Sequence, residues 1–252
     1  MQLRSSDAII LDVFNLHDYD RIVTLLTRSH GKKKGVARGA RRKYSRFAGQ
    51  LQPLAKVSVT WLEKEQSELA RVSSVELERS ASGLQGDLEG ILLGSYLADH
   101  MLEFAQENEP NDHLFRLLDS TLDALLADVD RGLAARYYEA WVLRIAGVFP
   151  APRECPACGR GLEKREVGVA ERGEGLICRD CGSGSWRPLG RETVEFLMRI
   201  GDENLMMLQQ RSPTNATLDE VEALCAEVRR SFLQRELKSY GVIRETLAGI
   251  QE

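Results

Sequence analysis

The sequence predicts an α+β protein in which a strand-rich N-terminal half precedes a helical half with a cysteine-containing insertion. Apolar residues alternate over roughly the first 80 positions, as they do on half-buried strands. From Ser82 they recur every three or four positions, as they do on helices. Between 150 and 190 this periodicity fades, and four of the five cysteines lie there. We therefore expect domains at 1–80 and 81–252, with the cysteine segment at 150–190 inside the second.

Five short strands are expected in the first half. They cover Asp7–Phe14, Arg21–Thr27, Lys33–Arg38, Gln50–Leu62 and Glu68–Leu77. His30-Gly31 is a turn signal that makes the second and third strands a hairpin. Five strands in about 75 residues suit a small closed barrel of the OB type. A sandwich is the alternative, although it usually has more strands.

The second half predicts several helices. Helical spacing covers 84–105, 114–126 and 131–147, and it returns from Glu192 onward. Pro110 separates the first two helices, and Gly147 with Pro150 ends the third. Thr217-Leu-Asp-Glu220 has the capping-box pattern, so we expect Thr217 to cap the last helix. That helix should bury Cys225 as a small apolar residue, together with Phe232.

Charge is spread unevenly along the 252 residues, whose net charge is -4. Residues 1–62 carry a net +8, residues 63–130 a net -12, and residues 131–252 balance. No apolar run reaches the ~18 residues that a membrane span needs. The N-terminus lacks the pattern of a secretory signal, so we expect a cytosolic protein.

The positive charge is concentrated in Gly31–Trp61, which holds nine lysines or arginines and no acid. Phosphates require cations and bases require flat rings, and this segment offers both. It therefore predicts a polyanion-binding surface, with Trp61 as a further ring on a strand. The alternative is a solvated loop, or a face that balances the acidic segment at 63–130. The candidate binding residues are Lys32, Lys33, Lys34, Arg38, Arg41, Arg42, Lys43, Tyr44, Arg46, Phe47 and Lys56.

The cysteines form two C-x-x-C-G motifs, Cys155/Cys158 and Cys178/Cys181, separated by nineteen residues. This spacing is typical of a two-knuckle zinc site, in which both thiolates of each pair face one tetrahedral ion. Four thiolates leave no open coordination position, so one structural Zn²⁺ is expected. The alternatives are four unliganded thiols or a redox pair.

No motif for catalysis is present. The sequence contains no P-loop, no G-x-S-x-G, no H-E-x-x-H and no kinase set. Asp18 and Asp20 could form a carboxylate pair, but acids at the start of a strand are more often turn residues or ion-pair partners. We therefore expect a protein that is not an enzyme.

Several of these segments resemble a known family. Asp20–Thr27, Gly35–Arg42, Ser45–Phe47 and Gly49–Pro53 resemble the N-terminal signature of the bacterial DNA repair protein RecO family. The helical middle and the two cysteine motifs resemble its C-terminal half, so the resemblance spans essentially the whole chain. At His17–Tyr19 the sequence departs from the family pattern.

The resemblance implies an N-terminal OB-fold and a helical domain with a zinc-binding insertion. It implies a DNA repair and recombination mediator that binds single- and double-stranded DNA and anneals complementary strands. The implied partners are RecR, SSB, and RecA or RecF, with RecR helping to load RecA onto SSB-coated DNA. The implied location is cytoplasmic and nucleoid-associated, without a membrane.

Annealing two anionic strands predicts a second basic surface. We expect it at Arg131, Arg136, Arg229 or Arg230, or on a second protomer. Two other functions fit the residues alone. One is a zinc-containing RNA-binding or translation-associated module, and the other is a scaffold that docks acidic peptide tails.

Overall fold

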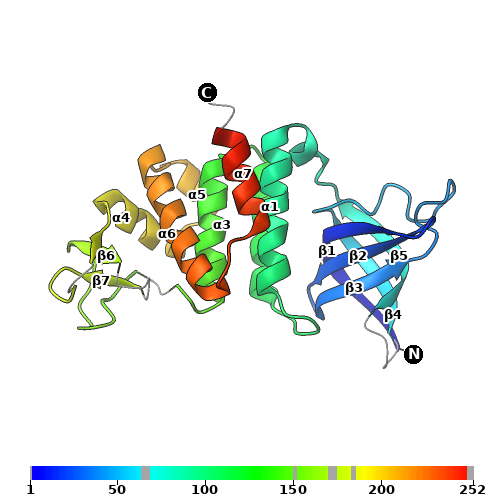
Figure 1. The fold of residues 1–252 in the computed structure, drawn as a ribbon, viewed down its shortest axis with the longest axis horizontal. Coiled ribbons are helices and arrows are strands. Elements are labelled where there is room, and N and C mark those ends of the chain that lie inside the picture. Colours follow the sequence, from blue (N-terminus) through cyan, green and yellow to red (C-terminus); the bar gives the residue numbers. More distant parts are fainter. Residues whose placement is uncertain (1, 64–68, 150–151, 170–174, 183–185, 249–252) are drawn as a thin grey trace. The chain divides into compact units, whose positions relative to one another are not determined.

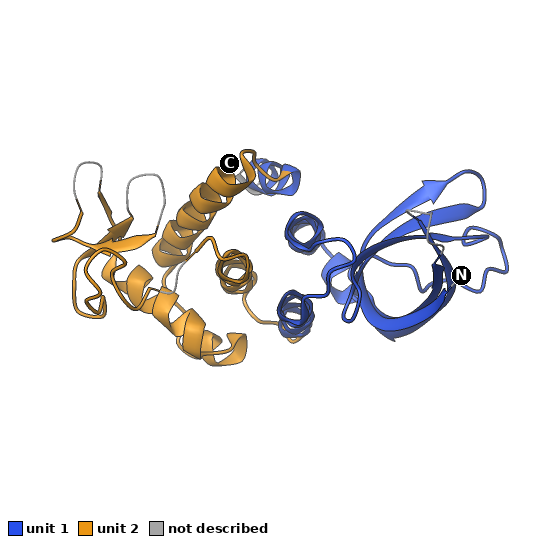
Figure 2. Cartoon of the chain, turned by 90° about the horizontal axis from the view of Figure 1, so that it is seen from below, with its two compact units in different colours: residues 1–126, 238–252 blue, residues 127–237 orange. Residues whose placement is uncertain are grey.

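The computed structural model describes residues 2–63, 69–149, 152–169, 175–182 and 186–248 (Figure 1). The chain divides into two compact units (Figure 2). Unit 1 comprises residues 1–126 and 238–252, and unit 2 comprises residues 127–237. Among the described residues, no helix is long and apolar enough to cross a membrane.

Unit 1 begins with a five-stranded closed barrel (Figure 1). Its strands are β1 (Gln2–Leu16), β2 (Asp20–Thr27), β3 (Gly31–Ala37), β4 (Lys56–Glu63) and β5 (Ala70–Arg79). They are ordered β1-β2-β3-β5-β4, and β4 pairs back onto β1 to close the ring. The β3/β5 pair is parallel, while the other pairs are antiparallel. The α+β fold with an OB-like barrel is therefore confirmed.

Strand β1 is longer than the predicted Asp7–Phe14 because it pairs with two other strands. Its first half pairs with β4 and its second half with β2, with a register shift between Ile10 and Asp12. A strand that bends to close a barrel commonly carries such a bulge. Glu68, the expected first residue of the last strand, lies outside the described residues.

The β2–β3 hairpin turns at Gly31, as predicted. Its φ of +69° is in the left-handed region, which glycine adopts without strain. A Cβ at this position would lie 2.4 Å from the carbonyl oxygen of Glu109, so the site also lacks room for a side chain.

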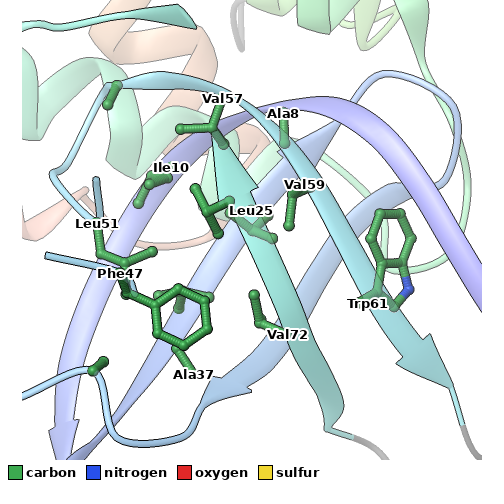
Figure 3. Packing of buried hydrophobic residues seen from close by; sticks show 14 residues of the cluster. Ala8, Ile10, Leu25, Ala37, Phe47, Leu51, Val57, Val59, Trp61 and Val72 are labelled. Carbon is green, nitrogen blue, oxygen red and sulfur yellow. The ribbon is translucent and has the colours of Figure 1, made fainter. Parts of the chain in front are cut away.

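The barrel interior is filled by one apolar cluster (Figure 3). Strand residues such as Val57, Val59 and Trp61 point inward at every second position, as the alternation predicts. The loop between β3 and β4 adds Phe47 and Leu51 to the same cluster. The loop is therefore anchored in the core of the barrel.

In the described part of unit 1, three α-helices and a short 3-10 turn follow the barrel. They are η1 (Ser82–Gln85), α1 (Leu88–Phe104), α2 (Asp112–Leu126) and α7 (Lys238–Ala248). Asp87 caps α1 by accepting from the Gly90 N–H at 2.8 Å. Helix α7 packs on α1, where Asp99 accepts a 2.6 Å hydrogen bond from the Ser239 hydroxyl. The change from strand to helix lies between Arg79 and Ser82, while the compact unit continues to Leu126.

Unit 2 contains four helices and a small sheet among its described residues. The helices are α3 (Arg131–Ile145), α4 (Arg191–Asp202), α5 (Leu205–Gln209) and α6 (Asn215–Leu233). The sheet has the order β7-β6-β8, formed by β6 (Val167–Val169), β7 (Leu176–Cys178) and β8 (Arg187–Pro188). These short strands were not predicted from the sequence, because apolar residues show little periodicity between 150 and 190. Pro150, expected to end the third helix, lies outside the described residues.

The expected capping box at Thr217 is wrong. The residue that caps α6 is Thr214, whose hydroxyl accepts from the Thr217 N–H at 3.4 Å. The Thr217 hydroxyl instead donates to Glu192 of α4 at 2.7 Å, and Glu220 accepts from the Gly190 N–H at 3.0 Å. The two helices thus stabilise each other's N-termini, an arrangement that a local motif does not reveal. Phe232, which was expected to be buried on α6, is also exposed.

Candidate nucleic-acid interface and metal centre

The nine bases of Gly31–Trp61 divide into two groups in the structure. The four lysines lie on β3 and β4, and three of them pair with carboxylates. Lys33 donates to Glu63 at 2.5 Å, and Lys34 lies 3.3 Å from Glu107. Both acids belong to the acidic segment at 63–130, so the charge-balancing alternative holds for these lysines.

The other two lysines are engaged as well. Lys56 donates to Asp119 of α2 at 2.7 Å, and the same carboxylate accepts from Arg79 of β5 at 2.6 Å. Lys32 donates to the carbonyl of Leu102 at 2.5 Å, and burial lowers its pKa. We therefore leave Lys32, Lys33, Lys34 and Lys56 out of the proposed interface.

The remaining five bases lie on the loop between β3 and β4 and are all exposed. We call them the loop cations: Arg38, Arg41, Arg42, Lys43 and Arg46. Among the described residues, no carboxylate lies within ion-pair distance of any of them. Their positive charge is consequently open to an external anion, whereas that of the neighbouring lysines is largely matched within the fold.

The loop is held at its base and anchored in the barrel. Asp20 accepts a 2.8 Å hydrogen bond from the Gly39 N–H, and the Arg41 N–H donates to the carbonyl of Tyr19 at 2.9 Å. Phe47 is buried in the barrel cluster (Figure 3). Asp20 therefore acts as a turn acid, as the simpler interpretation predicted, and the loop cations are presented from a fixed base.

Two of the three rings expected to face a ligand are buried. Phe47 is 2% exposed and Trp61 is 1% exposed, and the Trp61 indole N–H donates to Glu63 at 3.0 Å. The expectation that these rings contact a base is corrected, because both fill the barrel core. Tyr44, in contrast, is 89% exposed beside Lys43, whose ammonium lies 5.6 Å from its ring centroid.

Sequence reasoning missed Tyr19 and Arg71. Tyr19 lies in the β1–β2 turn, and the guanidinium of Arg42 lies 5.4 Å from its ring centroid. Arg71 is exposed at the start of β5, next to β3 in the parallel pair. Both lie outside the basic segment in sequence, and only the strand order brings them to it.

The arginines expected to form a second basic surface are engaged in unit 2. Arg229 is fully buried and donates to Glu236 at 2.8 Å, and Arg230 pairs with the same carboxylate at 3.1 Å. Arg136 pairs with Glu139 and Glu222. This expectation is corrected for Arg229, which is buried, and for Arg136, which is 11% exposed between two carboxylates. Arg230 shares its one carboxylate with Arg229 and is 62% exposed, so a second basic surface at Arg230 stays a prediction.

The four cysteines of the two C-x-x-C-G motifs form one cluster, as predicted. Their sulfurs all lie within 4.8 Å of one another, and the Cys158 and Cys178 sulfurs are 3.8 Å apart. A tetrahedral ion with Zn–S bonds of about 2.3 Å separates its sulfurs by about 3.8 Å. In each motif the glycine N–H donates to the carbonyl of the first cysteine, at 2.8 Å for Gly159 and 3.0 Å for Gly182. The donor set and its spacing fit a soft metal ion.

The electrostatics of the cluster favour a thiolate. Desolvation raises the pKa of Cys155, but backbone N–H groups of Cys178, Ala157 and Cys158 outweigh it and lower this pKa to about 6. Hydrogen bonds with Cys158 and Cys178 raise the pKa of Cys181 to about 12. Negative charge on one sulfur opposes it on the next, so a cation is needed before all four can ionise.

Cys225, the fifth cysteine, lies apart from this cluster. It is fully buried on α6, and burial raises the pKa of its thiol. It behaves as the small apolar residue that the sequence predicted.

Comparison with known proteins identifies relatives across the chain. The family model "Recombination protein O N terminal" matches residues 1–81, and "Recombination protein O C terminal" matches residues 85–241. A DNA repair protein RecO of Anaeromyxobacter sp. (strain K) is 36% identical over 199 residues, covering 78% of each chain. That of Desulforamulus reducens is 30% identical over 241 residues, covering 95% of this chain and 93% of its own. That of Geobacter sulfurreducens is 34% identical over 197 residues, covering 77% and 78%.

Proposed function

Because this chain belongs to the RecO family of DNA repair proteins, we propose that its loop cations bind the phosphates of DNA. One observation carries the proposal. Five exposed bases share one loop without a carboxylate partner among the described residues, while the lysines on the adjoining strands are engaged. A surface of this kind attracts a polyanion from a distance and releases counterions when it binds.

Family membership supports a fuller version of the proposal. The protein binds single- and double-stranded DNA, anneals complementary strands and, with RecR, helps load RecA onto DNA coated with SSB; RecF is a further candidate partner. It works in the cytoplasm on nucleoid DNA, by binding rather than by catalytic turnover. The four cysteines hold one Zn²⁺, which stabilises the local fold of unit 2 when bound.

The first experiment measures binding of a fluorescent single strand over a series of salt concentrations. The test variant is Arg38→Ala/Arg42→Ala/Arg46→Ala, which removes three loop cations. The control is Arg116→Ala/Arg191→Ala/Arg211→Ala, which removes three exposed arginines that form surface ion pairs elsewhere. Both variants lose the same net charge, so a difference between them reports position rather than total charge.

Each phosphate contact contributes about 0.7 to the slope of log affinity against log salt for a single strand. Losing three contacts should therefore lower the magnitude of this slope by about 2. With 1 M salt as the reference, that change corresponds to roughly 100-fold weaker binding at about 0.1 M salt. The control should change the slope by much less. Equal slopes for the test variant and the wild type would remove the loop from the interface.

Two other functions remain to be tested against this one. Competition between matched DNA and RNA strands decides whether the 2′-OH matters, and a preference for RNA would favour an RNA-binding module. Titration with an acidic peptide tests the scaffold function. Tight peptide binding with negligible nucleic-acid binding at low salt would favour that function instead.

A further inference from the structure

An apolar row crosses the outer face of the barrel on three neighbouring strands. Phe14 of β1 pairs with Ile22 of β2, and Ile22 pairs with Val36 of β3. The next residues on two of these strands, Val23 and Ala37, belong to the core cluster. Successive side chains alternate across a strand, so the three residues of the row point outward. We call Phe14, Ile22 and Val36 the outer row.

The outer row lies open, although the other end of the same face is covered. Leu26 lies on the same outward face of β2 as Ile22, but it is buried. Its partner on β1, Ile9, is buried too, and helix α1 packs against β1. Phe14, in contrast, is 56% exposed, and Ile22 and Val36 are partly exposed. Packing within unit 1 therefore explains the covered end of the face but does not explain the outer row.

Cations border this row. Val36 pairs with Arg71 of β5, so an exposed arginine ends the row, and Arg38 follows Val36 by two positions. Tyr19, which is 55% exposed, adds an aromatic ring at the β1–β2 turn, with Arg42 5.4 Å from its centroid. Flat rings and aliphatic side chains bordered by arginines match a ligand with flat apolar faces and a negative backbone.

We propose that Phe14 and Tyr19 stack the bases of a single strand whose phosphates the loop cations hold. This inference rests on the proposed function and deepens it, because it assigns strand preference to particular side chains. In a duplex the base faces are stacked on one another, so an unpaired strand alone can offer them to Phe14. The row spans two strand spacings, about 10 Å, which gives room for consecutive bases. The site therefore favours unpaired over paired nucleic acid.

The test replaces Phe14 and measures both single-strand and duplex binding. Phe14→Ala and Phe14→Leu should each weaken single-strand binding by about tenfold, because one base–aromatic stack contributes roughly 5- to 150-fold. Phe14→Trp should restore binding, since the indole also offers a flat face. Duplex binding should change by less than about twofold in all three. Tyr19→Ala should behave like Phe14→Ala, and Tyr19→Phe like the wild type.

Leu3→Ala is the matched control, because Leu3 is an exposed apolar residue at the other end of β1. It should leave both affinities unchanged. Unfolding midpoints equal to the wild type establish that each variant is folded, as expected for exposed positions. Single-strand binding by Phe14→Leu that equals that of the wild type would overturn the stacking inference. So would an equal loss of single-strand and duplex binding.

The outcomes separate this inference from the proposed function. Removing three loop cations could weaken the binding of both single-strand and duplex DNA while Phe14 variants leave both affinities unchanged. In that case the loop binds DNA and the outer row does not. If the loop variant also leaves both affinities unchanged, the proposed function fails as well.

Discussion

Replacing Phe47 tests whether its ring anchors the loop or contacts a ligand. The side chain is 2% exposed within the barrel cluster, so Phe47→Ala leaves a cavity and should lower the free energy of unfolding by about 3–5 kcal/mol. Phe47→Leu keeps most of the apolar volume and should cost less than about 1.5 kcal/mol. Tyr44→Ala, at a position 89% exposed, should cost no more than about 0.5 kcal/mol.

Urea denaturation followed by the fluorescence of Trp61 provides the assay, with Trp141 and Trp186 replaced by Phe in every variant. Trp61 lies in the same cluster as Phe47, so its signal reports the barrel. Single-strand affinity is measured on the same samples. If the Phe47 ring stacked on a base, Phe47→Leu would weaken single-strand binding by roughly 5- to 150-fold, while the free energy of unfolding stayed nearly constant. That result, or an Ala variant as stable as the wild type, would refute the anchoring role.

Three further predictions follow from the contacts described above. Cys158→Ser should reduce bound zinc from about one ion per chain to near zero by elemental analysis, since the site would lose one of its four thiolates; retained zinc would exclude Cys158 as a ligand. Asp119→Ala should lower the free energy of unfolding by about 1–3 kcal/mol in urea denaturation, because it removes a carboxylate that Lys56 and Arg79 share. Asp123, which also pairs with Arg79, is more exposed, so Asp123→Ala should lower it by less than about 1 kcal/mol. Equal losses for the two variants would contradict this. Hydrogen bonds from Lys33 and Trp61 lower the pKa of Glu63 below its ordinary value of 4.5, so this stabilisation is present above pH 4.5 and is lost as the pH falls through the lowered pKa. Glu63→Gln should therefore flatten the decline of the unfolding midpoint as the pH falls below 4.5, and an unchanged decline would count against it.

The barrel and the four-cysteine cluster could be predicted from the sequence because their signals are local. Alternation at Val57, Val59 and Trp61 follows directly from the geometry of a strand, and Gly31 marks the turn of the hairpin. The spacing within each C-x-x-C pair allows both sulfurs to face one point, and the structure brings all four sulfurs within 4.8 Å of one another. Such features require no knowledge of the distant chain.

The division of the basic segment could not be predicted in this way. Whether a lysine is open or paired depends on which acid the fold brings to it. Asp119 lies 63 residues from Lys56, and Glu107 lies far along the chain from Lys34. Composition gives the total charge of a segment, whereas tertiary contacts decide how much of it an external ligand meets.

The aromatic residues show the same limit. Phe47 is surrounded by bases in the sequence, and Phe14 closes an apolar run, so local context favours Phe47 as the ligand-facing ring. The structure shows the opposite burial: the loop places Phe47 in the core, and the pairing of β1 with β2 turns Phe14 outward. Exposure of an aromatic ring depends on register, which a single sequence does not specify.

The anchoring of the β3–β4 loop has a consequence for how this surface can diversify. Phe47 and Leu51 belong to the barrel core, and the backbone of Arg41 is fixed to the neighbouring turn, so the segment from Arg42 to Arg46 lies between two clamps. Substitutions or insertions between the clamps alter reach and charge density without disturbing the packed interior. Under the proposed function, exchanging this short segment between relatives would change DNA affinity one loop residue at a time while the barrel core stayed intact.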